Sequence, residues 1–146
     1  MAKDPVLVAY ALTVVVNSLN LLVLWSISGI VRGRTMTTMN PEDAAMAQRR
    51  GASVVTVDPP EVARVLRVHR NSFDNTVPFL LLGFVFAALG PDKIEAQILF
   101  GVFTGARLLF SFAYLKGLQP WRTISFLVGV LTTLALTIEV CRLALS

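Results

Sequence analysis

Apolar residues recur in four long stretches, and polar residues collect in the segments between them. The pattern predicts membrane-spanning helices over about residues 5–31, 61–89, 94–115 and 121–145, since a helix needs roughly 20 residues to cross the hydrocarbon of a bilayer. The turn at 89–92 (LGPD) and the link at 116–120 (KGLQP) are short, and short connections favour antiparallel neighbours. We therefore expect one all-α domain over residues 1–146, an integral membrane up-down four-helix bundle.

The connection 32–60 is the only long one. Within it, Asn40-Pro41-Glu42-Asp43 is typical of a helix start, with Asn40 as the N-cap, Pro41 at the first helical position and acidic residues in the first turn. Gly51 is expected to end this short helix.

Composition and charge agree with a membrane protein. The 146 residues are 55% hydrophobic and only 15% charged, whereas soluble domains carry about 25% charged residues. Most of the basic residues behind the net charge of +4 lie in or beside residues 32–70. By the positive-inside rule, this predicts that residues 32–60 are cytoplasmic and that both termini lie on the opposite side. The basic residues form no stripe interleaved with aromatics, so nucleic-acid binding is not expected.

Candidate chemistry begins with Arg107, which lies deep inside the third apolar stretch. A guanidinium in hydrocarbon costs at least ~2.5 kcal/mol, so Arg107 is expected to face a polar interior and to meet a partner or an anionic ligand. Tyr114 lies seven residues later and shares its helix face with Arg107. Tyr114 is either an anchor at the membrane interface or part of the same pocket.

A second polar set lies on one face of the second helix, within an arc of about 100°. Its members are Arg67, Arg70, Asn71, Asp74 and Pro78. The arginines could simply extend to lipid headgroups. Asn71 and Asp74 lie deeper, however, and the set carries both signs of charge, which favours a site for a zwitterionic ligand.

Arg122 and Thr123 open the fourth helix directly after Pro120. A guanidinium, a hydroxyl and a helix N-terminus together form a favourable place for an anion. The alternative is that Arg122 extends to the headgroups beside Trp121. A metal site is not expected, because Cys141 is the only cysteine and His69 has no companions at ligand spacing.

These residues carry a resemblance to a known family. The segment RVLRVHRNSFDNTVPFLLLGFVFAALGP (64–91), together with NPED (40–43) and GARLLFSFAYL (105–115), resembles the membrane-associated proteins in eicosanoid and glutathione metabolism (the MAPEG superfamily). The second helix is most similar to the prostaglandin E synthase branch, and the fourth (RTISFLVGVLTTLAL) to the microsomal glutathione transferase branch.

The resemblance implies a homotrimer of four-helix protomers with glutathione sites at the subunit interfaces on the cytoplasmic side. It implies catalytic roles for Arg122 and Thr123 beside the glutathione sulfur. Asp43 matches an aspartate proposed as catalytic in the synthase branch, although a helix-capping role explains it equally well. The implied glutathione-binding residues are Arg32, Arg67, Arg70, Asn71, Asp74, Arg107, Tyr114 and Phe126.

The chain departs from the family pattern at several positions. Asp74 replaces a glutamate, Phe110 replaces a histidine, and Phe126 and Val130 stand where the synthase branch has tyrosine and glutamine. Phe126 agrees with the transferase branch. These differences count against prostaglandin isomerase activity, but they leave the arginine set intact.

The resemblance therefore implies a membrane glutathione transferase, also a glutathione-dependent peroxidase, that activates glutathione as a thiolate. Its second substrate would be a lipophilic electrophile or lipid hydroperoxide that arrives from the membrane lipid. The expected location is a bacterial inner membrane or an ER-type membrane, with the active site on the cytoplasmic side and no metal. Two alternatives stay open: a glutathione-dependent eicosanoid-type synthase or isomerase, and a non-catalytic lipid-binding member of the family.

Overall fold

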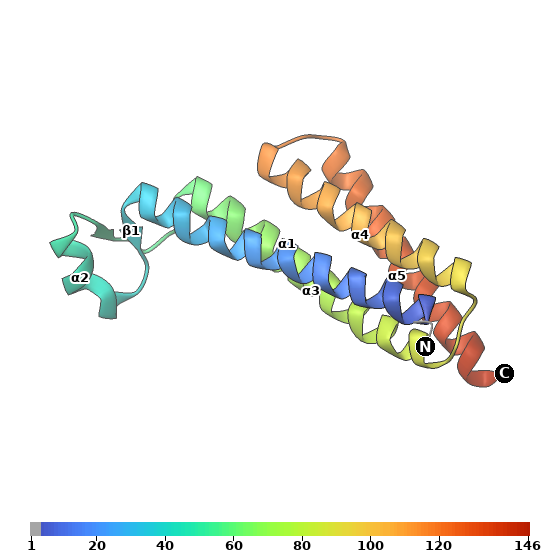
Figure 1. The fold of residues 1–146 in the computed structure, drawn as a ribbon. Helices are drawn as coiled ribbons and strands as arrows, with labels where there is room; N and C mark the ends of the chain where they lie inside the picture. The colour runs from blue at the N-terminus through green and yellow to red at the C-terminus, as the bar shows by residue number, and fades with distance from the viewer. Residues whose placement is uncertain (1–3) are drawn as a thin grey trace.

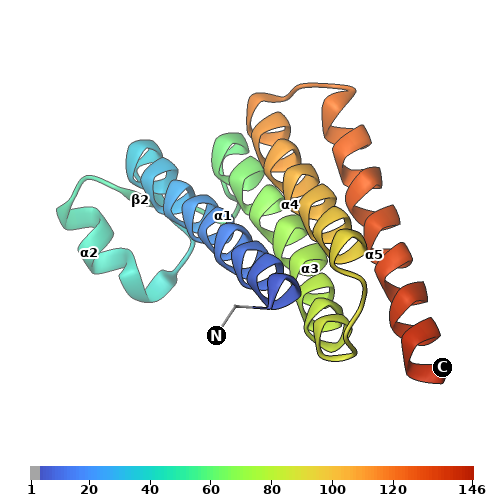
Figure 2. The ribbon, with the colours of Figure 1, turned by 45° about the vertical axis from the view of Figure 1, so that its right-hand side comes forward.

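The computed structural model describes residues 4–146 as a bundle of four long helices. They are α1 (Pro5–Thr35), α3 (Pro60–Ala88), α4 (Lys93–Lys116) and α5 (Trp121–Leu145). Successive helices run antiparallel, and the N- and C-termini lie at the same end of the bundle (Figures 1 and 2). The predicted fold class, an up-down four-helix membrane bundle, is confirmed.

The 4–146 region contains three helices that are long and apolar enough to cross a membrane, namely α1, α4 and α5. The exception, α3, is charged in its first half and apolar in its second. The outer faces of the helices also carry apolar side chains such as Leu12, Leu22, Leu131 and Ile138, each more than half exposed. Continuous apolar surface of this kind suits lipid rather than water.

The long connection folds into a small unit beyond the bundle, at the end opposite the termini (Figure 1). It contains β1 (Thr37–Thr38), the 3₁₀ turn η1 (Pro41–Asp43), α2 (Ala44–Arg49) and β2 (Ser53–Val54). β1 and β2 pair in parallel, which the sequence did not predict. The helix expected from Asn40 to Gly51 is therefore shorter and begins as a 3₁₀ turn, and Gly51 follows it with a positive φ of 72°.

The first helix extends four residues beyond the predicted limit of residue 31. Arg32 and Arg34 lie in its last turn, where positive side chains stabilise the negative end of the helix dipole. The chain then leaves the helix through Met36, which adopts a left-handed conformation.

Two buried layers hold the helices together. An aromatic layer lies toward the termini, where the rings of Phe79 and Phe103 stack with centroids 3.5 Å apart. A polar layer lies beside it: the Asn17 amide donates to the Thr104 hydroxyl (3.1 Å), and the Asn20 amide donates to the Ser111 hydroxyl (3.0 Å). Because unpaired polar groups are costly in an apolar interior, these bonds set the register between α1 and α4.

Candidate functional site

A pocket opens where α3, α4 and α5 meet, near the start of α5. Its volume is about 250 Å³. Five of the residues predicted from the sequence line it, and Phe110 is the sixth. The lining residues are Asn71, Phe110, Tyr114, Arg122, Thr123 and Phe126.

Arg122 is held over the face of Tyr114, with the guanidinium carbon 4.9 Å from the ring centroid. Gln119 lies beside it and satisfies both neighbours when its amide oxygen accepts from Arg122 Nε (3.1 Å) and its amide nitrogen donates to Thr123 Oγ1 (3.1 Å). Tyr114 and Gln119 thus orient the guanidinium and the hydroxyl predicted to act on an anion.

The backbone at the start of α5 contributes less than the sequence indicated. The N–H of Arg122 donates to the Leu118 carbonyl, and the N–H groups of Thr123 and Ile124 both donate to the Pro120 carbonyl. These three donors are already used, so the attraction for an anion here comes from the Arg122 charge and the helix dipole.

Arg107 lies next to this pocket and is fully buried, with 0% of its surface exposed. Three aromatic rings surround its guanidinium carbon, with centroids at 4.7 Å (Phe110), 5.8 Å (Phe103) and 5.9 Å (Phe126). Within residues 4–146 none of its side-chain nitrogens has a hydrogen-bond partner. The polar surroundings that we predicted are thus mainly aromatic, and cation–π contacts provide the observed stabilisation.

Gly129 makes room for this arginine. A Cβ atom placed on Gly129 would lie 2.8 Å from Arg107 Nη2 and 3.0 Å from Nε. The guanidinium therefore rests directly on the backbone of α5, an approach that only glycine allows.

The charged residues of α3 lie elsewhere. Arg67 is exposed, and Arg70 and Asp74 form an ion pair of 3.9 Å with side chains that are 87% and 61% exposed. The buried face of α3, which includes Val65, Val68 and Ser72, points the opposite way. The charged members of the predicted stripe, Arg67, Arg70 and Asp74, therefore face outward from the chain, whereas Asn71 lines the pocket.

Two further predicted residues lie outside the pocket. Arg32 pairs with Asp58 at 3.3 Å. Asp43 accepts a hydrogen bond from the Asn40 amide (3.0 Å) in the unit beyond the bundle, and makes no side-chain cap bond to α2. Asp43 thus occupies the N-cap position of α2, but its carboxylate accepts from the Asn40 side chain and not from the backbone of the helix.

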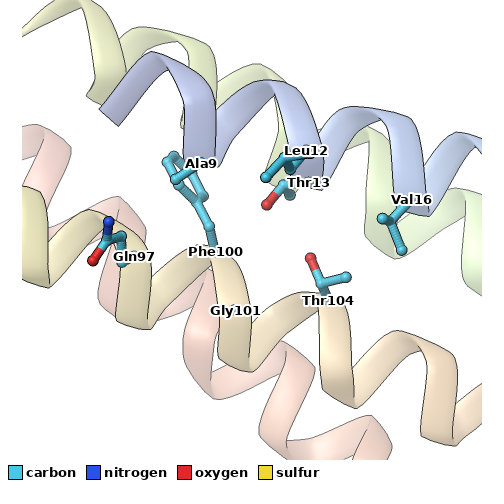
Figure 3. Close-up of a pocket in the computed structure, with 8 residues that line it drawn as sticks. All are labelled: Ala9, Leu12, Thr13, Val16, Gln97, Phe100, Gly101 and Thr104. Atoms are coloured by element: carbon cyan, nitrogen blue, oxygen red, sulfur yellow. The ribbon is translucent and has the colours of Figure 1, made fainter. Parts of the chain in front are cut away.

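A different cavity, of about 270 Å³, lies between α1 and α4. In Figure 3, Thr13 and Thr104 border it from the two helices, and Phe100 extends from α4 toward α1. None of the described residues that line it is charged, so it lacks the features predicted for the site.

Sequence reasoning missed Gln119 and Gly129. Gln119 precedes Pro120, directly before α5, and nothing in the spacing of polar residues along the sequence linked it to Arg122 or Thr123. Gly129 lies seven residues after Arg122, on the same face of the helix. That spacing could have indicated a position under the pocket.

The chain is similar in sequence to several known proteins. The MAPEG family model matches residues 10–141. The prostaglandin E synthase of Bos taurus is 35% identical over 96% of this chain and 90% of its own length. The corresponding human enzyme is 34% identical over 94% and 90%. The microsomal glutathione S-transferase 1 of Rattus norvegicus is 34% identical over 97% and 93%.

Proposed function

The chain belongs to the MAPEG family, and from this premise we propose that it is a membrane-bound glutathione transferase that also reduces lipid hydroperoxides. The observation that carries the proposal is the pairing of two arginines at one pocket. Arg107 is buried and has no side-chain hydrogen bond within residues 4–146, and Arg122 lies at the pocket wall. Two relatives of nearly full coverage bear names that denote a glutathione transferase and a prostaglandin synthase.

Glutathione carries two carboxylates, one amine and one thiol. We propose that each of these groups is bound by a side chain of opposite charge or by a hydrogen-bond donor. Arg107 and Asn71 line or border the pocket with unpaired polar atoms, including Asn71 Oδ1. A buried guanidinium without hydrogen bonds gains most from an anionic oxygen, because such charge-assisted bonds are about twice as strong as neutral ones. The carboxylate of Asp74 is proposed to form an ion pair with the amine of glutathione.

Arg122 and Thr123 are proposed to activate the thiol. The thiolate is the nucleophile, and a free thiol has a pKa of about 8.5. Lowering the thiol pKa by one to two units requires about 1.4–2.7 kcal/mol. A guanidinium, a hydroxyl and the positive end of α5 can together supply that much.

The site is proposed to be completed by a second copy of the chain in a homotrimer. Arg67, Arg70 and Asp74 face outward from α3, and Arg32 lies in the last turn of α1. Charged side chains on the outer face of a membrane bundle are stabilised when another protein surface covers them. In a trimer, Arg32, Arg67, Arg70 and Asp74 of one copy would contact a glutathione molecule that the pocket of the neighbouring copy binds.

The second substrate is proposed to be a lipophilic electrophile or hydroperoxide that enters from the bilayer. Phe110 and Phe126 line the pocket with rings, and the exposed side chains of α5 are largely apolar. Holding the thiolate and the substrate together would supply the remaining acceleration by proximity. The active site is proposed to face the cytoplasm, where the basic segment 32–70 is expected.

The test is a kinetic and binding comparison on the full chain purified in detergent. We expect glutathione-dependent conjugation of an aryl halide and reduction of cumene hydroperoxide. Arg122→Ala should lower turnover by about 10²-fold or more while changing the glutathione dissociation constant little, and should reduce the ultraviolet absorbance of the bound thiolate. Arg49→Ala, which removes an exposed charge on α2, is the control. An Arg122→Ala variant with undiminished thiolate absorbance would contradict the assignment.

A second candidate function is a glutathione-dependent eicosanoid-type synthase, which the identity to the two prostaglandin E synthases favours. Incubation with prostaglandin endoperoxide and glutathione distinguishes the synthase from the transferase. Isomerised product without conjugation of aryl halides would favour the synthase.

A further inference from the structure

A cavity separate from the Arg122 pocket lies where α1 and α4 end and α3 begins. Its volume is about 550 Å³. Its rim carries Arg34, Arg64, Lys116 and Glu61, and it shares no lining residue with the Arg122 pocket. The two lie on different sides of the last turn of α4, since Leu115 and Lys116 line one and Tyr114 the other.

The rim is positively charged and not internally neutralised. Three cations face one carboxylate, and within residues 4–146 none of the four groups takes part in an ion pair. Arg64 Nη1 lies 3.7 Å from the Cβ position of Gly117, which places that guanidinium at the C-terminal end of α4. Glu61 lies in the first turn of α3. The cavity thus presents an excess of positive charge to an incoming group.

The inner wall is apolar. Ile27 and Val31 come from α1, Val65 from α3 and Leu115 from α4. Arg34 follows Val31 on α1 by about one helical turn, so the cations mark the level at which the apolar stretch gives way to a polar one. In a bilayer this level corresponds to the headgroups.

We propose that this cavity binds an anionic phospholipid. Arg64, Lys116 and Arg34 contact the phosphate, and the upper part of one acyl chain lies along Val31 and Leu115. Charge complementarity selects an anionic headgroup over a neutral one. The apolar wall selects a lipid over a soluble phosphate, which would contact only the rim.

The experiment is native mass spectrometry of the full chain in detergent, titrated separately with phosphatidylglycerol and phosphatidylcholine of identical acyl chains. We expect tighter binding of phosphatidylglycerol. The double variant Arg64→Gln/Lys116→Gln should lose roughly fivefold of that affinity for each cation removed and should bind both lipids alike. Glycerol 3-phosphate, a soluble phosphate without acyl chains, should bind far more weakly than phosphatidylglycerol.

Two further variants keep the proposal falsifiable. Glu61→Gln removes the one carboxylate that lines the cavity among residues 4–146 and should raise the affinity for phosphatidylglycerol, a gain that misfolding cannot produce. Arg49→Gln removes one exposed charge from α2, outside the cavity, and should leave the preference unchanged. The proposal is overturned if the wild-type chain binds both lipids equally, or if the double variant keeps the preference for phosphatidylglycerol. It is also overturned if Arg49→Gln loses as much affinity for phosphatidylglycerol as the double variant does. Binding of glycerol 3-phosphate as tight as that of the lipid would likewise overturn it. None of these readouts depends on glutathione.

Discussion

Gly129→Ala provides a sharp test of how Arg107 is positioned. The added methyl carbon would lie 2.8 Å from Nη2, 3.0 Å from Nε and 3.2 Å from Cζ of Arg107. Carbon and nitrogen atoms without a bond between them prefer separations of about 3.5 Å or more. The guanidinium must therefore move by several tenths of an ångström or more, and the rings of Phe103, Phe110 and Phe126 restrict where it can go.

The magnitude follows from two opposing terms. Overpacking of a filled interior costs about 1–3 kcal/mol, while replacing glycine by alanine inside a helix gains about 0.5–1 kcal/mol. We expect a net loss of stability of up to about 2 kcal/mol from these terms. Displacement of Arg107 should also weaken glutathione binding about tenfold, since one charge-assisted hydrogen bond contributes roughly 1.5 kcal/mol.

The assay combines calorimetric titration of glutathione with thermal unfolding in detergent. Gly105→Ala is the matched control, because its added methyl group meets no atom of a neighbouring element within 4 Å in the described part of the chain. It should leave glutathione binding unchanged. In an Arg107→Met background, Gly129→Ala should have no further effect on glutathione affinity, since the two changes act through one side chain. A Gly129→Ala protein that binds glutathione as tightly as the wild type would refute the idea that Arg107 contacts the ligand from its observed position.

Two other outcomes are expected. Arg70→Ala should weaken glutathione binding severalfold with a smaller change in turnover, and a calorimetric dissociation constant equal to that of the wild type would remove Arg70 from the site. Asp92 accepts hydrogen bonds from the N–H groups of Ile94 (2.8 Å) and Glu95 (3.1 Å), and the bonds from Glu95 and Ile94 hold the pKa of its carboxyl below the usual value. A lowered folded-state pKa stabilises the fold above the ordinary aspartate pKa, and this contribution is lost as the pH falls through the folded-state value. Asp92→Ala should thus lower the Tm at neutral pH and less so in acid; a Tm difference that is constant with pH would argue against the carboxylate as the cause.

The order of the long helices followed from the four apolar stretches, and their antiparallel direction followed from the short connections between them. The polar faces followed from helical spacing. Arg107 and Phe110 are both buried on α4, and Phe110 and Tyr114 line the same pocket, as their spacing along the helix predicts. These features are local: 3.6 residues per turn determine which side chains lie together on a helix.

The periodicity of the sequence did not predict which side chains of different helices contact one another. The sequence alone determined the four long helices, their antiparallel order and the sets of residues that share a face, because each depends on near neighbours along the chain. Only the tertiary structure decided that the stripe of Arg70 and Asp74 faces outward, that Tyr114 supports Arg122 and that Gly129 receives Arg107. Helix geometry says which residues point the same way, but packing between helices decides what each face meets.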